Sequence, residues 1–213
     1  MQNTDNYMEK FTLLPAFTIQ GIAAASGLVL INNDLYIISD NSTYLYNYNI
    51  NDKILNKIPV TENPEENIPK KEKKDFESIT LFDNKLYLYG SGSTEKREKR
   101  FAFDLETKTI AKKDSGKLYK KLKKHANIQD DAFNIEGVIH TKTQKYFFQR
   151  GNKGNNSNGI FIVNREDKSI VFKEINLPKI QDIEASFTDA VLHENTIYFL
   201  AAVENSQSTY LDG

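Results

Sequence analysis

The chain contains no cysteine and carries almost no net charge. Without cysteine it can form neither a disulfide scaffold nor a thiolate zinc site, and it lacks a cysteine nucleophile. Its 28 basic residues nearly cancel its 29 acidic ones. A nucleic-acid coat protein needs a basic surplus for its phosphate contacts. We therefore expect no nucleic-acid partner.

Long apolar runs and catalytic signatures are also missing. No stretch approaches the roughly 20 apolar residues that cross a bilayer, and residues 1–7 lack the pattern of a signal peptide. We predict no membrane span and a cytoplasmic location, with a processed, exported form as the alternative. The three histidines belong to no zinc-protease motif, and the serine-hydrolase elbow and dinucleotide fingerprint are absent. Nothing in the sequence supports nucleophilic catalysis.

Short apolar runs separated by polar turns fill the chain instead, with 11 tyrosines and 13 phenylalanines among them. Four segments share one pattern: a small or acidic residue, an apolar strand, a polar turn and an aromatic-rich strand. They span residues 26–38, 77–89, 136–148 and 189–200. Turn lengths differ, so the third and fourth alignments carry a one-residue ambiguity. A second hairpin follows the first three, at 44–55, 101–110 and 160–171.

Two hairpins make a four-stranded antiparallel sheet, and such units recurring every roughly 50 residues are typical of a β-propeller. We therefore predict an all-β fold, a propeller of four-stranded antiparallel blades, with a β-sandwich as the alternative. Residues 1–213 would form one domain of about three and a half blades, C-terminally incomplete. A compact four-unit ring completed by residues 11–19 is the other possibility. Two inserts interrupt the repeat: a polar loop at 62–74 and a predicted helix at 115–128.

The repeat also predicts a site. The first strand of each blade lines the central channel, so Ser26, Glu77, Glu136 and Asp189, which begin these strands, should surround the channel mouth. Converging carboxylates are costly unless protons, cations or water compensate for them. A hard cation with oxygen ligands, Ca²⁺ or Mg²⁺, is one solution. Glu77, Glu136 and Asp189 are therefore candidate metal ligands. In the alternative, each carboxylate caps backbone N–H groups at its own strand.

A second candidate group has the composition of a phosphate cradle. Glycines in Gly90-Ser-Gly-Ser-Thr let backbone N–H groups approach an anion, and arginines bind one with a planar fork. The segment is not a P-loop, because it lacks the Gly-Lys-Ser/Thr ending. The alternative is a glycine-rich turn with solvent-facing charges. The candidate ligand-binding residues are Ser91, Ser93, Arg97, Arg100, Arg150 and Asn152.

Several motifs occur together in order: Asp75-Phe-Glu-Ser, Gly90-Ser-Gly-Ser-Thr, Asn134-Ile-Glu-Gly, Phe148-Gln-Arg-Gly-Asn and Phe187-Thr-Asp-Ala. With them the chain resembles an uncharacterised bacterial family of single-domain β-propellers, similar to those called esterase-like or phytase-like. The resemblance implies a six-bladed ring, longer than this chain. Phytase-type propellers bind and hydrolyse phosphate esters with carboxylate-bound Ca²⁺. By this resemblance the metal side would be Glu77, Glu136 and Asp189, and the phosphate side Arg97, Arg100 and Arg150.

Two functions follow as hypotheses. The first is a propeller that binds a small polar or anionic molecule at the channel mouth, together with a divalent cation such as Ca²⁺. The alternative is a metal-dependent phosphoesterase, in which the metal activates water and arginines hold the phosphoryl group. The chain lacks the dense acidic clusters of a phytase. A third class, a protein-interaction platform, would use the outer loops or the lysine-rich helix.

Overall fold

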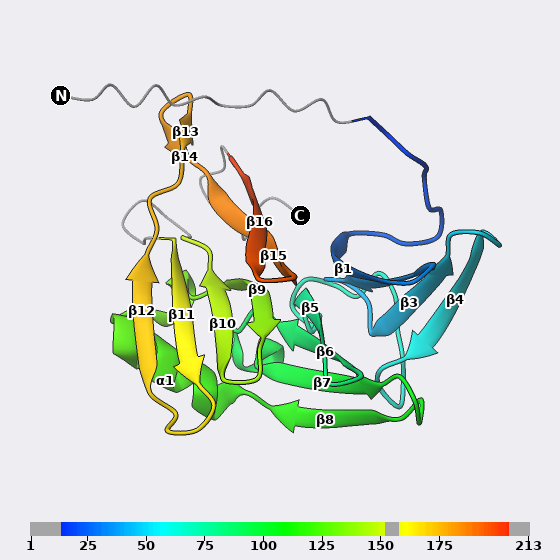
Figure 1. Cartoon of the computed structure of the whole chain (residues 1–213), viewed down its shortest axis with the longest axis horizontal. Helices are drawn as coiled ribbons and strands as arrows, with labels where there is room; N and C mark the ends of the chain where they lie inside the picture. Colours follow the sequence, from blue (N-terminus) through cyan, green and yellow to red (C-terminus); the bar gives the residue numbers. More distant parts are fainter. Residues whose placement is uncertain (1–13, 152–157, 205–213) are drawn as a thin grey trace.

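The computed structural model describes residues 14–151 and 158–204 and is dominated by antiparallel sheets (Figure 1). Three sheets have four strands each, paired in chain order. The first contains β1 (Ala25–Ile31), β2 (Asp34–Ser39), β3 (Tyr44–Asn49) and β4 (Ile54–Pro59). The second contains β5 (Phe76–Phe82), β6 (Lys85–Gly90), β7 (Lys99–Asp104) and β8 (Ile110–Asp114). The third contains β9 (Ile135–His140), β10 (Gln144–Gln149), β11 (Gly159–Asn164) and β12 (Ile170–Glu174). The predicted all-β fold of four-stranded sheets is confirmed.

Two smaller sheets follow. The strands β15 (Ser186–His193) and β16 (Thr196–Ala202) form the fourth predicted hairpin, and β13 (Lys179–Ile180) pairs with β14 (Ile183–Glu184). Turn chemistry explains why these hairpins form. Asn32, Asp83, Asn84 and Glu194 all have positive φ between 51° and 55°. Asparagine and aspartate tolerate this left-handed region better than other residues with a Cβ, so they specify the tight turns.

The sheets are arranged like blades, with the first strand of each toward the centre (Figure 1). Strand β5 lies beside β1 and β9, and β9 lies beside β15. All six residues of β9 are buried, whereas β8 and β12, the last strands of their sheets, are largely exposed. In the third sheet burial therefore decreases from the inner strand to the outer strand.

The apolar core lies in layers between neighbouring sheets. Ile38 and Leu45 of the first sheet pack with Phe76 of the second, and Phe148 of the third packs with Phe187 of β15. The rings of Phe148 and Phe187 meet edge to face, with centroids 5.3 Å apart, a favourable geometry for aromatic pairs. Each inter-sheet layer fixes how two neighbouring blades sit against each other.

The single α-helix of the described residues, α1 (Gly116–Ala126), connects β8 to β9. It lies inside the range 115–128 for which the sequence predicts a helix. Tyr119 and Leu122 are its buried residues, and the Tyr119 hydroxyl donates to the Gly90 carbonyl over 2.8 Å. Residues 62–74 contain no strand or helix. None of the helices in residues 14–151 and 158–204 has the length and apolarity needed to cross a membrane.

Candidate functional site

Each innermost strand has a β-bulge near its start. The register shifts fall between Ala25 and Gly27, Phe76 and Ser78, Ile135 and Gly137, and Phe187 and Asp189. In every case one residue of the inner strand is left out of the pairing. A bulge redirects the side chain that it carries and is common beside functional sites. The four bulge residues, which we call the mouth residues, are Ser26, Glu77, Glu136 and Thr188.

The fourth mouth residue corrects a prediction. The register places Thr188, and not Asp189, at the position equivalent to Glu77 and Glu136. Asp189 instead corresponds to Gly137, the paired residue that follows the bulge. Burial raises the pKa of Asp189 to about 6, and its carboxylate accepts a hydrogen bond from the Ala190 amide over 2.7 Å. The fourth turn has two residues, like the first and second, so Thr188 lies eight positions before the next strand, as Ser26 and Glu77 do; the sequence alignment was shifted from this register by one residue.

Glu77 and Glu136 stand at equivalent bulges on the neighbouring strands β5 and β9. The pKa of Glu77 lies well above its usual value, first because the carboxyl is buried and then because the negative charge of Glu136 is near. Burial raises the pKa of Glu136 to about 7 even though Arg150 favours the charged form. Desolvation therefore disfavours the ionisation of both carboxyls, and the negative charge of Glu136 also repels that of Glu77. A cation between them would relieve that repulsion.

The surroundings of Glu136 supply further polar groups. The Asn134 amide donates to Glu136 Oε1 over 2.6 Å, and Arg150 contacts the same oxygen at 3.4 Å. Arg150 also forms an ion pair with Glu204 at 2.5 Å. Asn134 Oδ1 is buried and has no hydrogen-bond partner in the described structure. A free oxygen therefore lies on the side chain that already contacts Glu136.

Behind Glu77 lies an ionic network that the sequence patterns did not reveal. Carboxylate oxygens of Asp40, Asp75 and Glu77 lie within 4.8 Å of one another. Lys73 Nζ bridges Asp40 at 2.5 Å and Asp75 at 3.0 Å, and Arg97 contacts Asp75 at 2.9 Å. Asp75 and Arg97 are both buried. Two positive charges thus balance Asp40 and Asp75, while Glu77 forms no ion pair with any described residue.

The serine-rich loop predicted to cradle a phosphate holds one of these carboxylates. Ser91 Oγ donates to Asp75 over 2.6 Å and lies 2.9 Å from Ser93 Oγ. Arg97 donates to Ser93 over 3.0 Å as well as contacting Asp75. The structure thus brings Ser91, Ser93 and Arg97 together, as expected of an anion cradle. The anion that they hold is the side chain of Asp75.

The three arginines expected on a phosphate lie in separate surroundings. Arg97 is bound to Asp75, and Arg150 is bound to Glu136 and Glu204. Arg100, on β7, lies over the rings of Tyr87 and Tyr89 instead. The three arginines therefore do not share a common partner. Asn152, the remaining predicted ligand residue, lies outside the described residues.

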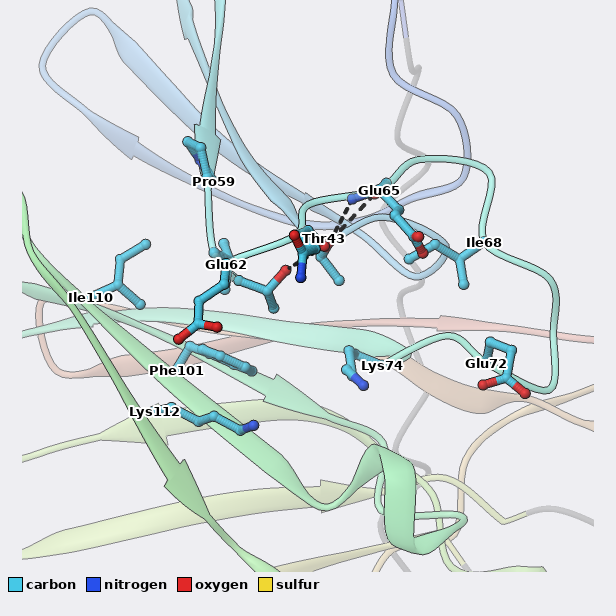
Figure 2. A pocket seen from close by; sticks show the side chains of 13 residues that line it. Thr43, Pro59, Glu62, Glu65, Ile68, Glu72, Lys74, Phe101, Ile110 and Lys112 are labelled. Atoms are coloured by element: carbon cyan, nitrogen blue, oxygen red, sulfur yellow. Dashed lines mark hydrogen bonds between the residues drawn. The ribbon is translucent and has the colours of Figure 1, made fainter.

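A cavity of about 690 Å³ opens between the first and second sheets, under the loop 62–74 (Figure 2). Thr43 and Glu65 tie that loop down, since the Glu65 amide donates to Thr43 Oγ1 over 2.8 Å and the Thr43 amide donates to the Glu65 carbonyl over 2.9 Å. The wall of the cavity contains the acidic residues Glu62 and Glu72, the basic residues Lys74 and Lys112, and the ring of Phe101 (Figure 2). None of the mouth residues lines it, so it is separate from the Glu77–Glu136 site.

Comparison with known proteins identifies the family of the chain. Residues 21–213 match the model of a family described as one of unknown function. No curated protein matches the sequence. Among solved structures, the chain is similar to one titled "Structure of U3-55K", with 10% identity and a TM-score of 0.43. That match covers 81% of this chain and 44% of the other, so the chain spans less than half of that protein.

Proposed function

The chain belongs to the family of unknown function DUF6929, and we propose that it is a β-propeller protein that binds a small polar or anionic ligand at the channel mouth, with a divalent cation between Glu77 and Glu136. The observation that carries this proposal is the pair of carboxyls at equivalent bulges of the neighbouring strands β5 and β9, where desolvation disfavours the ionisation of both.

The propeller architecture is supported by the order of the strands. Every four-stranded sheet presents its first strand to the centre, and the inner strands lie side by side. Apolar side chains are exposed on the first and last sheets: Leu28 and Leu30 on β1, and Tyr198, Phe199 and Leu200 on β16. Such faces are the surfaces that neighbouring blades bury in a ring.

The donor set fits a hard cation. Ca²⁺ and Mg²⁺ are bound by carboxylate, amide and water oxygens. Glu77 and Glu136 supply two carboxylates, and Asn134 Oδ1 beside them is a buried oxygen without a partner. Asp40 Oδ1, in the network behind Glu77, is a second one. A bound cation would stabilise both glutamates as carboxylates and would satisfy these oxygens.

Arg150 gives the site a place for an anionic group of the ligand. It lies beside Glu136 and is largely buried, so its charge is less screened than that of a surface arginine. A bound cation and Arg150 would together attract an anionic or strongly polar ligand. Arg97 and Arg100 are engaged elsewhere, so no observation favours phosphoester hydrolysis over binding.

Calorimetric titration of the protein with Ca²⁺ and Mg²⁺ tests the proposal. We expect saturable binding that Glu136→Gln weakens at least about tenfold, a loss of ~1.4 kcal/mol or more. Glu106→Gln, a matched change at an exposed turn residue, should bind like the wild type.

Absence of saturable binding of either cation, or equal affinity in Glu136→Gln, would overturn the cation site. Hydrolysis of p-nitrophenyl phosphate by the Ca²⁺-loaded protein, abolished by Glu136→Gln, would instead identify the site as that of a phosphoesterase.

A further inference from the structure

A cluster of cationic side chains lies between the second and third sheets, at the end of β9 opposite to Glu136. Glu136 and the last residue of β9, His140, are four positions apart, which corresponds to about 13 Å along a strand. The cluster is therefore separate from the channel mouth. It has members from β7, β9, β10 and the segment after β11. We call it the inter-sheet basic cluster; its residues are Arg100, His140, Lys145 and Arg165.

Aromatic rings hold the cluster in place. The Arg100 guanidinium lies 5.4 Å from the centroid of Tyr87, and that of Arg165 lies 4.2 Å from the centroid of Phe82. The His140 ring packs on the same two aromatic rings, with centroid distances of 4.6 Å to Tyr87 and 5.7 Å to Phe82. Stacking of this kind fixes an arginine while leaving its N–H edges available. The two arginines are thus positioned on either side of one histidine.

No carboxylate compensates these charges. Among the described residues, none of Arg100, Lys145 and Arg165 takes part in an ion pair. Asp104, at the far end of β7 from Arg100, is paired with Lys85 instead. Burial and the positive charges of Arg100 and Arg165 lower the pKa of Lys145 to about 8. Unpaired cations in a partly buried place repel one another, and this arrangement costs stability unless an anion is present.

The cluster also contains three buried nitrogen atoms without a hydrogen-bond partner among the described residues: Arg100 Nε, Arg165 Nη2 and His140 Nδ1. His140 is 5% exposed. Arg100 donates to the Tyr89 oxygen over 3.4 Å, and the Tyr89 hydroxyl lies 2.8 Å from His140 Nε2. If Tyr89 donates to Nε2, the proton of the neutral ring is on Nδ1, which is then a donor. A buried donor without an acceptor is uncommon in native proteins, because its desolvation is uncompensated.

We propose that the inter-sheet basic cluster is a binding site for a tetrahedral oxyanion, either inorganic phosphate or sulfate or the phosphate group of a small molecule. Three cations around one place match an anion with two negative charges better than a single carboxylate does. Its several oxygens can accept the unpaired N–H groups from different directions. Arg100, Lys145 and Arg165 are half-buried, so solvent reaches the cluster.

Calorimetric titration with sodium phosphate, sodium sulfate and sodium acetate at constant ionic strength tests the proposal. We expect phosphate and sulfate to bind saturably, and chloride and acetate at the same ionic strength to be without effect. Lys145→Met and Arg165→Gln should each weaken phosphate binding at least about tenfold, or ~1.4 kcal/mol. Lys173→Met removes an exposed lysine from the same sheet and should leave binding unchanged. Titration with a phosphate monoester such as glycerol phosphate distinguishes the free ion from a phosphorylated ligand.

Thermal unfolding with and without phosphate provides a second measurement in case a variant folds poorly. Without added oxyanion, Lys145→Met should be at least as stable as the wild type, since it removes one of the repelling charges, and phosphate should stabilise only the wild type. The proposal fails if neither phosphate nor sulfate binds more strongly than chloride. It also fails if acetate alone binds, or if Lys145→Met and Arg165→Gln bind phosphate as tightly as the wild type.

Discussion

The buried carboxylate of Asp75 is the central acceptor of the ionic network behind Glu77. It accepts from Ser91 and contacts both Lys73 and Arg97. Removing one member of a buried charge group leaves the others uncompensated, which costs more than the interaction itself is worth.

We therefore predict that Asp75→Asn lowers the free energy of unfolding by about 3 kcal/mol. The carboxamide keeps the shape of the side chain but cannot balance Lys73 and Arg97. Urea denaturation measures the change. Asp52→Asn, at an exposed turn residue of the β3–β4 hairpin, should change stability by less than about 0.5 kcal/mol. Equal effects of the two substitutions would contradict a structural role for Asp75.

Lys145 gives the protein a specific pH dependence. Its pKa in the folded state, about 8, is below the ordinary value of 10.5, because of burial and the positive charges around it. Those charges come from β7, β8, the segment after β11 and the β11–β12 turn: Arg100, Lys113, Arg165 and Lys168. His140, which faces the same cluster from β9, is neutral at these pH values because its pKa is lowered to about 2.

Below pH 8 Lys145 is charged in both the folded and the unfolded state, and the repulsion is present in full. Between pH 8 and 10.5 the folded protein loses this proton first. The unfolded chain then binds more protons, so the contribution of Lys145 to the free energy of unfolding rises with pH. We predict that wild-type stability relative to Lys145→Met increases over this interval in oxyanion-free buffer. A difference that is flat or falls with pH would contradict it.

At the scale of elements, α1 and the 90–93 loop form one unit. Gly92 has a φ of +78°, and a Cβ placed there would lie 2.5 Å from the ring of Tyr119 and 2.8 Å from that of Phe133. Both the backbone conformation and the space therefore require glycine. The contact matters for the site, because the same loop presents Ser91 and Ser93 to Asp75.

We predict that Gly92→Ala lowers the free energy of unfolding by about 2 to 4 kcal/mol, the sum of backbone strain and overpacking. Gly21→Ala is the matched control. Gly21 also has a positive φ, +94°, but a Cβ there would meet only Leu55, at 3.4 Å. Gly21→Ala should lower the free energy of unfolding by only about 1 kcal/mol, because it adds backbone strain without overpacking. Similar losses in both variants by urea denaturation would show that the Tyr119 contact is unimportant.

The strands and turns could be predicted from the sequence because their causes are local. Asn32 and Asn84 specify tight turns between apolar runs, so the hairpins were found within a few residues of their true ends. The equivalence of Glu77 and Glu136 at the starts of their strands also followed from the repeat, whereas the bulges that carry them did not. The register of β15 was not predicted correctly, since an alignment shifted by one residue puts Asp189 in the place of Thr188.

The side-chain partners could not be predicted, because they depend on segments that are distant in sequence. Arg97 and Arg100 are three residues apart and seemed to form one anion site. Arg97 ends a short 3₁₀ turn, Glu95–Arg97, and reaches Asp75, whereas Arg100 lies on β7 over the rings of Tyr87 and Tyr89. Asp40 and Asp75 lie 35 positions apart, and only the packing of the first sheet against the second brings both to Lys73.

Across the whole molecule, the two proposed sites lie at opposite ends of the same inner strand. Glu136 stands near the start of β9 and His140 at its end, and the buried residues between them pack into the layers on both sides. One end carries the carboxyls Glu77 and Glu136, and the other end carries the cationic side chains of the inter-sheet basic cluster. The near-zero net charge of the chain therefore includes an acidic group and a basic group at opposite ends of one strand. High salt should weaken the electrostatic attraction of ligands to both sites.

The repeated bulge has a consequence for how such a protein can diverge. Its backbone geometry recurs in four strands, yet the residue that it carries is serine, glutamate, glutamate and threonine in turn. Conformation at this position is evidently set by the strands around it and tolerates different side chains. Substitutions can therefore change the side chain at each of the four mouth residues independently, one sheet at a time, while the backbone of the inner strands is inherited unchanged.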